Sequence, residues 1–155
     1  MLVVGDSSVF INFAVIGEFE CLKSLSPIYI PDKVYEEVYS NGKYRPGSDE
    51  IYNAVQDGWI IVRTYTDNNL YAKLDHLHEG ERQALALAYD LNANLILLDD
   101  RAAVLEYKVY LRGNGVKRLG TKALCKKMYI DGIINVDPNT IELKLLEWAL
   151  KNNQI

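Results

Sequence analysis

Cysteine is scarce in this chain, which has 155 residues and only Cys21 and Cys125. Two isolated cysteines exclude a disulfide framework and a cysteine-based zinc site, so we expect two reduced thiols in a cytoplasmic protein. Long apolar runs are lacking as well, and none approaches the roughly 18 residues that a membrane helix needs. Neither a basic region nor a cleavage site precedes the first apolar run, so we expect no signal peptide and no membrane partner.

Several common catalytic patterns are also missing. The sequence has no phosphate-binding loop and no glycine-rich dinucleotide fingerprint. No Ser-His-Asp or Cys-His set has a supporting context. His76 and His78 lack the additional ligand that would complete a zinc site, so we interpret them as surface or loop residues. The eleven tyrosines are scattered; we expect some at a subunit interface, and the sequence does not indicate a stacking platform.

What is present fits a single globular domain over residues 1–155, with 49% apolar and 25% charged residues. The net charge of -4 argues mildly against nucleic-acid binding, but residues 101–127 hold eight basic side chains and one acid, Glu106. The basic residues are Arg101, Lys108, Arg112, Lys117, Arg118, Lys122, Lys126 and Lys127. Such a segment is either a solvated helix face or a surface for a polyanionic substrate.

Short apolar runs alternate with amphipathic segments along the chain. We expect strands at residues 2–5, 27–31, 59–63, 95–98 and 116–118. We expect helices at about 8–17, 48–57, 70–77, 101–112 and 120–130, and others that begin near residues 32, 79 and 137. This alternation predicts an α/β fold with a mostly parallel sheet that is covered on both sides.

Carboxylates follow two of these strands directly. Asp6 comes after residues 2–5, and Asp99 with Asp100 comes after residues 95–98. Ligands bind at this end of parallel strands, and two central neighbouring strands would place these acids on one crevice. Helix capping is the alternative role for Asp6 and Asp100. We expect one of Asp99 and Asp100 to be a site residue, and the sequence leaves open which.

A third carboxylate comes from the helix that begins near residue 32. Val34 and Val38 are spaced to face the core. Glu37 borders that buried face, whereas Glu36 projects further toward solvent. Two surface glutamates are the alternative interpretation.

The fourth comes from the start of the helix near residue 79, where Glu79 and Glu81 also complement the helix dipole. Glu81 precedes Ala84, Leu85 and Ala88 by three, four and seven residues. It therefore projects from the buried side of the first turn, and we favour it over Glu79. Four carboxylates brought together would repel one another without a cation, and a hard ion such as Mg²⁺ or Mn²⁺ prefers oxygen ligands.

Five segments together resemble the motifs of PIN-domain nucleases. Residues 3–12 resemble the amino-terminal motif, and residues 31–38 the second motif, whose acid Glu37 matches best. Residues 79–88 are similar to the Gly-Glu-x-x-Ala helix of one bacterial and archaeal branch, which makes Glu81 the third acid. Residues 98–103 resemble the fourth motif, and Gly120-Thr121 resembles a later helix start of that branch.

The resemblance implies a three-layer α/β/α sandwich with a five-stranded parallel sheet. It also implies a ribonuclease that depends on Mg²⁺ or Mn²⁺, commonly the toxin of a VapC-type toxin–antitoxin pair. Such proteins usually form homodimers and bind a small antitoxin that blocks the site. Glu81 stands where many of these toxins have Asp, and Leu98 where the fourth motif often has Thr or Ser.

We therefore expect metal-dependent hydrolysis of RNA, with Asp6, Glu37, Glu81 and Asp99 or Asp100 as metal and catalytic residues. The residues expected to contact substrate are Arg101, Lys108, Lys117 and Lys122 on the RNA backbone, and Ser8 or Thr121 as orienting hydroxyls. A weakly active or inactive module that mainly binds an antitoxin or regulatory partner is the alternative. A phosphoryl-acceptor domain would need an acceptor Asp after residues 59–63, where Thr64 stands.

Overall fold

Five parallel strands form one sheet in the computed structural model, which describes residues 1–65 and 68–152. The strand order is β3-β2-β1-β4-β5. The strands are β1 (Val3–Gly5), β2 (Ile28–Pro31), β3 (Ile60–Arg63), β4 (Leu95–Leu97) and β5 (Lys117–Leu119). Each lies within or one residue from an expected strand, so the apolar runs predicted the sheet correctly.

Helices connect the strands and complete the chain. They are α1 (Ser7–Val15), α2 (Asp32–Tyr35), α3 (Ser48–Gln56), α4 (Asn69–Lys73), α5 (Glu79–Asp90), α6 (Arg101–Tyr110), α7 (Thr121–Ile130) and α8 (Pro138–Lys151). A π-helical turn, η2 (Glu36–Ser40), continues α2, and two 3₁₀ segments are η1 (Phe19–Leu25) and η3 (Arg112–Asn114). The expected helix over 70–77 was too long, because α4 ends at Lys73 and a turn follows.

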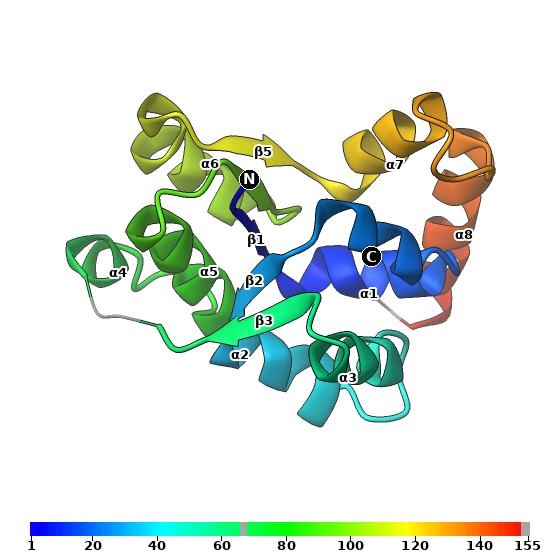
Figure 1. Cartoon of the computed structure of the whole chain (residues 1–155), viewed down its shortest axis with the longest axis horizontal. Coiled ribbons are helices and arrows are strands. Elements are labelled where there is room, and N and C mark those ends of the chain that lie inside the picture. The colour runs from blue at the N-terminus through cyan, green and yellow to red at the C-terminus, as the bar shows by residue number, and fades with distance from the viewer. Residues whose placement is uncertain (66–67, 153–155) are drawn as a thin grey trace.

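The helices form two layers, one on each face of the sheet (Figure 1). Helices α4, α5 and α6 lie on one side, and α1, α7 and α8 lie on the other (Figure 1). Strands β1 and β4 are wholly apolar because both of their faces are covered; Val3, Val4, Ile96 and Leu97 are completely buried. The fold is therefore the three-layer α/β/α sandwich of the PIN-like type.

The central pair of strands creates the crevice. Gly5 in β1 pairs with Leu97 in β4. From this pair the chain proceeds outward in opposite directions, from β1 to β2 and from β4 to β5. A topological switch point thus lies between the carboxyl ends of β1 and β4, which is where ligands bind in open α/β sheets. Asp6 follows β1 directly, and Asp99 follows β4 after Leu98. The expected adjacency of these two strands is confirmed.

Among the residues that the structure describes, no helix is long and apolar enough to cross a membrane.

Substitution of a buried residue in the central pair of strands should destabilise the fold. We expect Leu97→Ala to lower the free energy of unfolding by about 2–5 kcal/mol, because it removes completely buried methyl groups and leaves a cavity. Leu105→Ala is the control, since Leu105 is 56% exposed on α6, and it should cost less than about 0.5 kcal/mol. Urea unfolding followed by circular dichroism measures both values. Equal losses in the two variants would contradict the assignment of β4 to the core.

Candidate active site at the carboxyl edge of the sheet

Asp6 is buried at the carboxyl end of β1, with 1% of its surface exposed. Its backbone N–H donates to the Leu97 carbonyl at 3.0 Å, and this bond fixes it against β4. Oδ2 accepts a hydrogen bond from the Ser8 hydroxyl at 3.3 Å, whereas Oδ1 has no partner among the residues that the structure describes. An unpartnered buried carboxylate oxygen is costly. Asp6 therefore offers an atom that a cation would satisfy.

The environment of Asp6 disfavours its charged form. Burial raises the pKa of Asp6 from 3.8 to about 7, and the negative charges of Glu81 and Glu37 contribute to the rise. Asp6 occupies the residue before α1, but its side chain makes no capping bond to the helix. The capping role that the sequence allowed for Asp6 is therefore absent.

Glu37 reaches this region from η2. Its Oε2 accepts a hydrogen bond from the Ser7 hydroxyl at 2.7 Å, which links it to the first turn of α1. A Cβ atom at Gly80 would lie 2.8 Å from Glu37 Cδ, so only glycine lets α5 approach the carboxylate this closely. Glu36, by contrast, is exposed and pairs with Lys33 at 3.3 Å, so it does face solvent.

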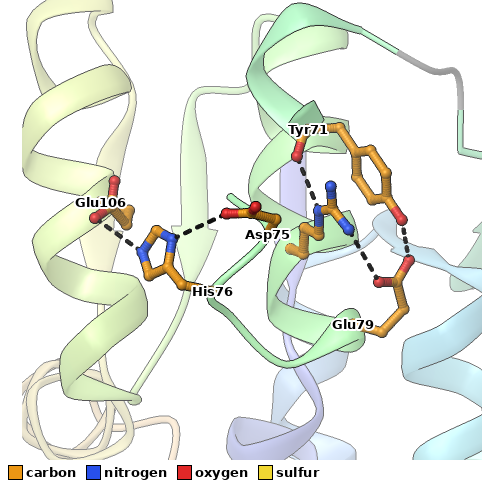
Figure 2. Close-up of polar contacts among 6 residues, drawn as sticks. Tyr71, Asp75, His76, Glu79 and Glu106 are labelled. Carbon is orange, nitrogen blue, oxygen red and sulfur yellow. Dashed lines mark hydrogen bonds and ion pairs between the residues drawn. The ribbon is translucent and has the colours of Figure 1, made fainter. Parts of the chain in front are cut away.

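Glu79 is committed to a contact between α4 and α5 (Figure 2). It accepts hydrogen bonds from the Tyr71 hydroxyl and from Gln83 Nε2, the latter at 3.0 Å. The guanidinium of Arg82 lies 3.6 Å from the centre of the Tyr71 ring and 3.8 Å from Glu79 Oε2. Although burial opposes it, the hydrogen bonds from Tyr71 and Gln83 hold the pKa of Glu79 below its ordinary value. This carboxylate is thus part of a structural clamp.

Glu81, two residues further along α5, faces the other carboxylates. Burial, and next the negative charge of Asp100, raise the pKa of Glu81 above its ordinary value. The charge of Glu37 acts in the same direction. The charge of Glu81 also acts on Asp6, whereas Glu79 is held by Tyr71 and Gln83. Glu81 and not Glu79 is therefore the α5 carboxylate that the fold brings toward Asp6.

The two adjacent acids after β4 have different surroundings. Asp99 is saturated with hydrogen bonds, from the Thr121 N–H at 2.7 Å, the Asn12 amide at 3.1 Å and the Thr121 hydroxyl. A Cβ atom at Gly120 would lie 2.7 Å from Asp99 Oδ1, so glycine is needed beside it. Asp99 thus ties the end of β4 to α1 and α7.

Asp100 caps α6, since its Oδ2 accepts from the Ala103 N–H at 3.0 Å. The capping role that the sequence allowed for it is confirmed. Its charge also acts on Glu81, so it belongs to the electrostatic group around Asp6. The two acids therefore differ: the charge of Asp100 acts on Glu81, whereas Asp99 is held by residues of α1 and α7.

The fold places only some of the residues expected to contact substrate at the carboxyl edge of the sheet. Ser8 lies against Asp6, and exposed Arg101 and Lys122 occupy the first turns of α6 and α7 at the carboxyl edge. Lys122 also pairs with Glu142 at 3.1 Å. Thr121 is 2% exposed and its hydroxyl is bound to Asp99, so it positions an acid.

Two of the expected basic residues lie away from the carboxylates. Lys108 is two turns further along α6 than Arg101. Lys117 begins β5 and pairs with Leu95, the first residue of β4, which places it at the opposite edge of the sheet. A charge run in the sequence does not show which residues share an edge of the sheet.

The histidines are surface residues, as expected. Exposed His76 lies between Asp75 and Glu106, with its Nε2 3.2 Å from Glu106 Oε1, and links the turn after α4 to α6 (Figure 2). His78 is exposed and immediately precedes α5.

The sequence did not reveal Asn12 or an aromatic stack. Asn12 donates to Asp99 and to the Thr121 hydroxyl, and its position four residues after Ser8 on α1 was the available signal. Tyr35, Tyr39 and Tyr52 stack in succession, with ring centres 5.3 and 5.1 Å apart. The sequence did not reveal this contact, although the four-residue spacing of Tyr35 and Tyr39 was the available signal.

The donor set fits a hard divalent cation in its chemistry. Asp6, Glu37, Glu81 and Asp100 are carboxylates, the ligands that Mg²⁺ and Mn²⁺ prefer, and Asp6 has an unsatisfied oxygen. Within the described chain, no three Asp, Glu, His or Cys side chains already lie close enough to surround one ion. The site is therefore a buried carboxylate with three others around it at longer range.

Comparison with protein-family models matches residues 2–147 to a family described as PIN domain. Comparison with curated proteins finds no match.

The buried carboxyl group should make stability depend on pH. A pKa of 3.8 in the unfolded chain and about 7 in the fold means that the folded state holds an extra proton between these values. The contribution of Asp6 to stability is therefore fully present below the lower value, and roughly 4 kcal/mol of it is lost in total as pH rises through the higher one. We expect Asp6→Asn to remove this decrease and to be more stable than the wild type at pH 8 without added metal. Urea unfolding from pH 4 to pH 8 measures it, and parallel pH profiles would contradict the burial of Asp6.

Gly80→Ala tests the approach of α5 to Glu37. Alanine favours the helix by up to about 1 kcal/mol, so the melting temperature should not fall. Its Cβ would displace the Glu37 carboxylate, and we expect the affinity for Mn²⁺ to drop at least about tenfold. Isothermal titration calorimetry measures this. Gly113→Ala is the control because a Cβ there meets nothing within 4 Å. Equal Mn²⁺ affinity in both variants would show that Glu37 does not contribute to a metal site.

Proposed function

The chain belongs to the PIN-domain family, whose members are generally nucleases, and from this we propose that it is a ribonuclease dependent on Mg²⁺ or Mn²⁺. The proposal includes the role of a cytoplasmic toxin in a toxin–antitoxin pair, acting as a homodimer that a small antitoxin inhibits. The nuclease-type fold is its basis; the choice of RNA, the metal and the partners are the proposed parts.

One observation carries the proposal. Asp6 Oδ1 is buried without a partner at the switch point of the sheet, and the charges of Glu37 and Glu81 act on the same carboxyl group. Such an arrangement is unfavourable for stability, and perturbed carboxyl groups gathered in a crevice are typical of functional sites. A hydrolase that holds divalent cations is the function that requires it most directly.

In this proposal Asp6, Glu37, Glu81 and Asp100 hold the cation. When bound, a divalent cation lowers the pKa of a coordinated water and stabilises negative charge on phosphate oxygens. Ser7 and Ser8 orient the carboxylates of Glu37 and Asp6 by their hydrogen bonds. Asp99 acts as a positioning residue that fixes the β4–α6 turn.

The substrate would approach over the first turns of α6 and α7. Arg101 and Lys122 lie there, and in this proposal they bind the RNA backbone without reading its sequence. Lys108 and Lys117 lie further away and would contribute only long-range attraction. Hydrolysis by water leaves a 5′-phosphate and a 3′-hydroxyl, and it needs no side-chain nucleophile.

A second candidate function is a binding module with little or no catalysis. It is favoured by the separation of the carboxylates, since within the described residues no three of them are positioned around one ion. An acidic crevice of this kind also binds an Arg or Lys of a partner protein well. The partner would then be an antitoxin or a regulatory protein.

Metal-dependent cleavage separates the two functions. We expect Mg²⁺ or Mn²⁺ to raise the melting temperature of the wild type and to support cleavage of a generic single-stranded RNA. Asp6→Asn and Glu81→Gln should each lower the cleavage rate at least about 100-fold while remaining folded. Glu79→Gln is the matched control, because Glu79 belongs to the clamp with Tyr71, and it should keep most of the activity.

Retained cleavage in folded Asp6→Asn would rule out this site. A folded wild-type protein that shows neither metal stabilisation nor cleavage would instead support the binding module.

A further inference from the structure

A small cavity adjoins the candidate site on the side of α1 and α8. Its volume is about 180 Å³, and it lies between residues 42–46 of the loop after η2, Ile11 of α1, and the end of α8. Glu37 and Val38 contribute to one wall, and Arg45 and Trp148 contribute polar and aromatic surface. In Figure 1 this loop, at the start of α3, approaches the carboxyl end of α8.

We propose that this cavity receives one unpaired base of the RNA substrate, with Trp148 as its stacking surface and Arg45 beside the adjoining phosphate. The inference rests on the proposed function, because it adds a positioning subsite to the same nuclease site. This subsite is separate from the basic residues of α6 and α7, since the residues that line it belong to other elements.

Continuity with the candidate site is the first reason. Glu37 lines the cavity and also accepts the hydrogen bond from Ser7 next to Asp6. Ile11, which also lines the cavity, is one helical turn after Ser7 on α1. A nucleotide bound here would therefore neighbour a phosphate held at the carboxylates.

Size is the second reason. A volume of about 180 Å³ equals that of about six water molecules, at about 30 Å³ each. This space suits one planar ring system and is too small for a helix of a partner protein. An unpaired base is such a ring system, and single-stranded RNA can turn a base out of its stack.

Chemistry is the third reason. Aromatic rings beside basic side chains are the usual means by which proteins bind single-stranded nucleic acids. Trp148 is half-buried, and the carbonyl of Trp148 accepts hydrogen bonds from Asn152, which secures the end of α8. The loop adds Lys43, which lies 5.3 Å from the ring of Tyr44, and Tyr44 itself is 93% exposed. Lys43 and Tyr44 line a neighbouring pocket, which shares Arg45 and Pro46 with this cavity.

Tryptophan fluorescence provides a direct test, because the chain has two tryptophans. Trp59 is buried against Phe19, whereas Trp148 lines the cavity. In the Asp6→Asn protein with EDTA, which prevents cleavage, we expect a single-stranded RNA octamer to quench the emission of Trp148. A Trp59→Phe variant should keep this quenching, and a Trp148→Phe variant should lose it. Quenching that persists in Trp148→Phe would overturn the proposal.

Affinity provides the second test. Fluorescence anisotropy of a labelled octamer should show that Trp148→Ala weakens binding at least about fivefold, which corresponds to the loss of one stacked base. Trp148→Phe keeps a ring and should retain most of the affinity. Tyr129→Ala is the matched control, since Tyr129 is a 42% exposed aromatic residue near the far end of α7, and it should bind like the parent protein. Equal affinities of Trp148→Ala and the control would overturn the proposal.

Kinetics distinguish positioning from folding. With Asp6 restored and metal present, Trp148→Ala should raise KM with little change in kcat, whereas a misfolded protein would lose kcat. If RNA is cleaved but Trp148→Ala leaves KM and binding unchanged, this inference fails and the proposed nuclease stands. If RNA quenches Trp148 but is not cleaved, the nuclease proposal fails and the base site stands.

Discussion

The burial of an uncompensated carboxylate at the end of β1 is the constraint on which the rest of the site depends. The hydrogen bond from the Asp6 backbone to Leu97 places this group at the centre of the sheet, where two layers of helices exclude water. The fold therefore keeps a group that lowers its own stability, and it does so where two strands diverge. Such a cost is retained where a ligand makes use of it. Around this point Glu37, Glu81 and Asp100 arrive from three different elements.

Two glycines make the convergence possible. Gly80 lets α5 come against the Glu37 carboxylate, and Gly120 lets the start of α7 come against Asp99. In both places a methyl group would occupy the position of a carboxylate atom. The two helix starts are therefore fitted to acidic side chains rather than to apolar ones. This also explains why the clamp of Glu79 and Tyr71 matters, since it fixes the first turn of α5 from its other side.

Much of this architecture could be predicted from the sequence, because it follows from local patterns. Apolar runs located the strands, and helical spacing separated Glu81 from Glu79 and Glu37 from Glu36. The difference between Asp99 and Asp100 could not be predicted, because Asp99 is bound by residues 87 and 22 positions away in the chain. The basic segment was misleading for the same reason: Lys117 begins a strand and Lys122 follows its end, so neighbours in sequence lie at opposite edges of the sheet.

The two ends of the described chain lie at different distances from the site. The backbone N–H of Leu2 donates to the Asn94 side chain at 2.7 Å, and Met1 is 73% exposed at the edge opposite the carboxylates. The end of α8, in contrast, lines the cavity beside Glu37. An affinity tag or fluorescent fusion is therefore best attached ahead of Met1, where it leaves the crevice open. The same fusion after α8 would lie beside the cavity, and a loss of activity could then result from steric blockage by the fusion.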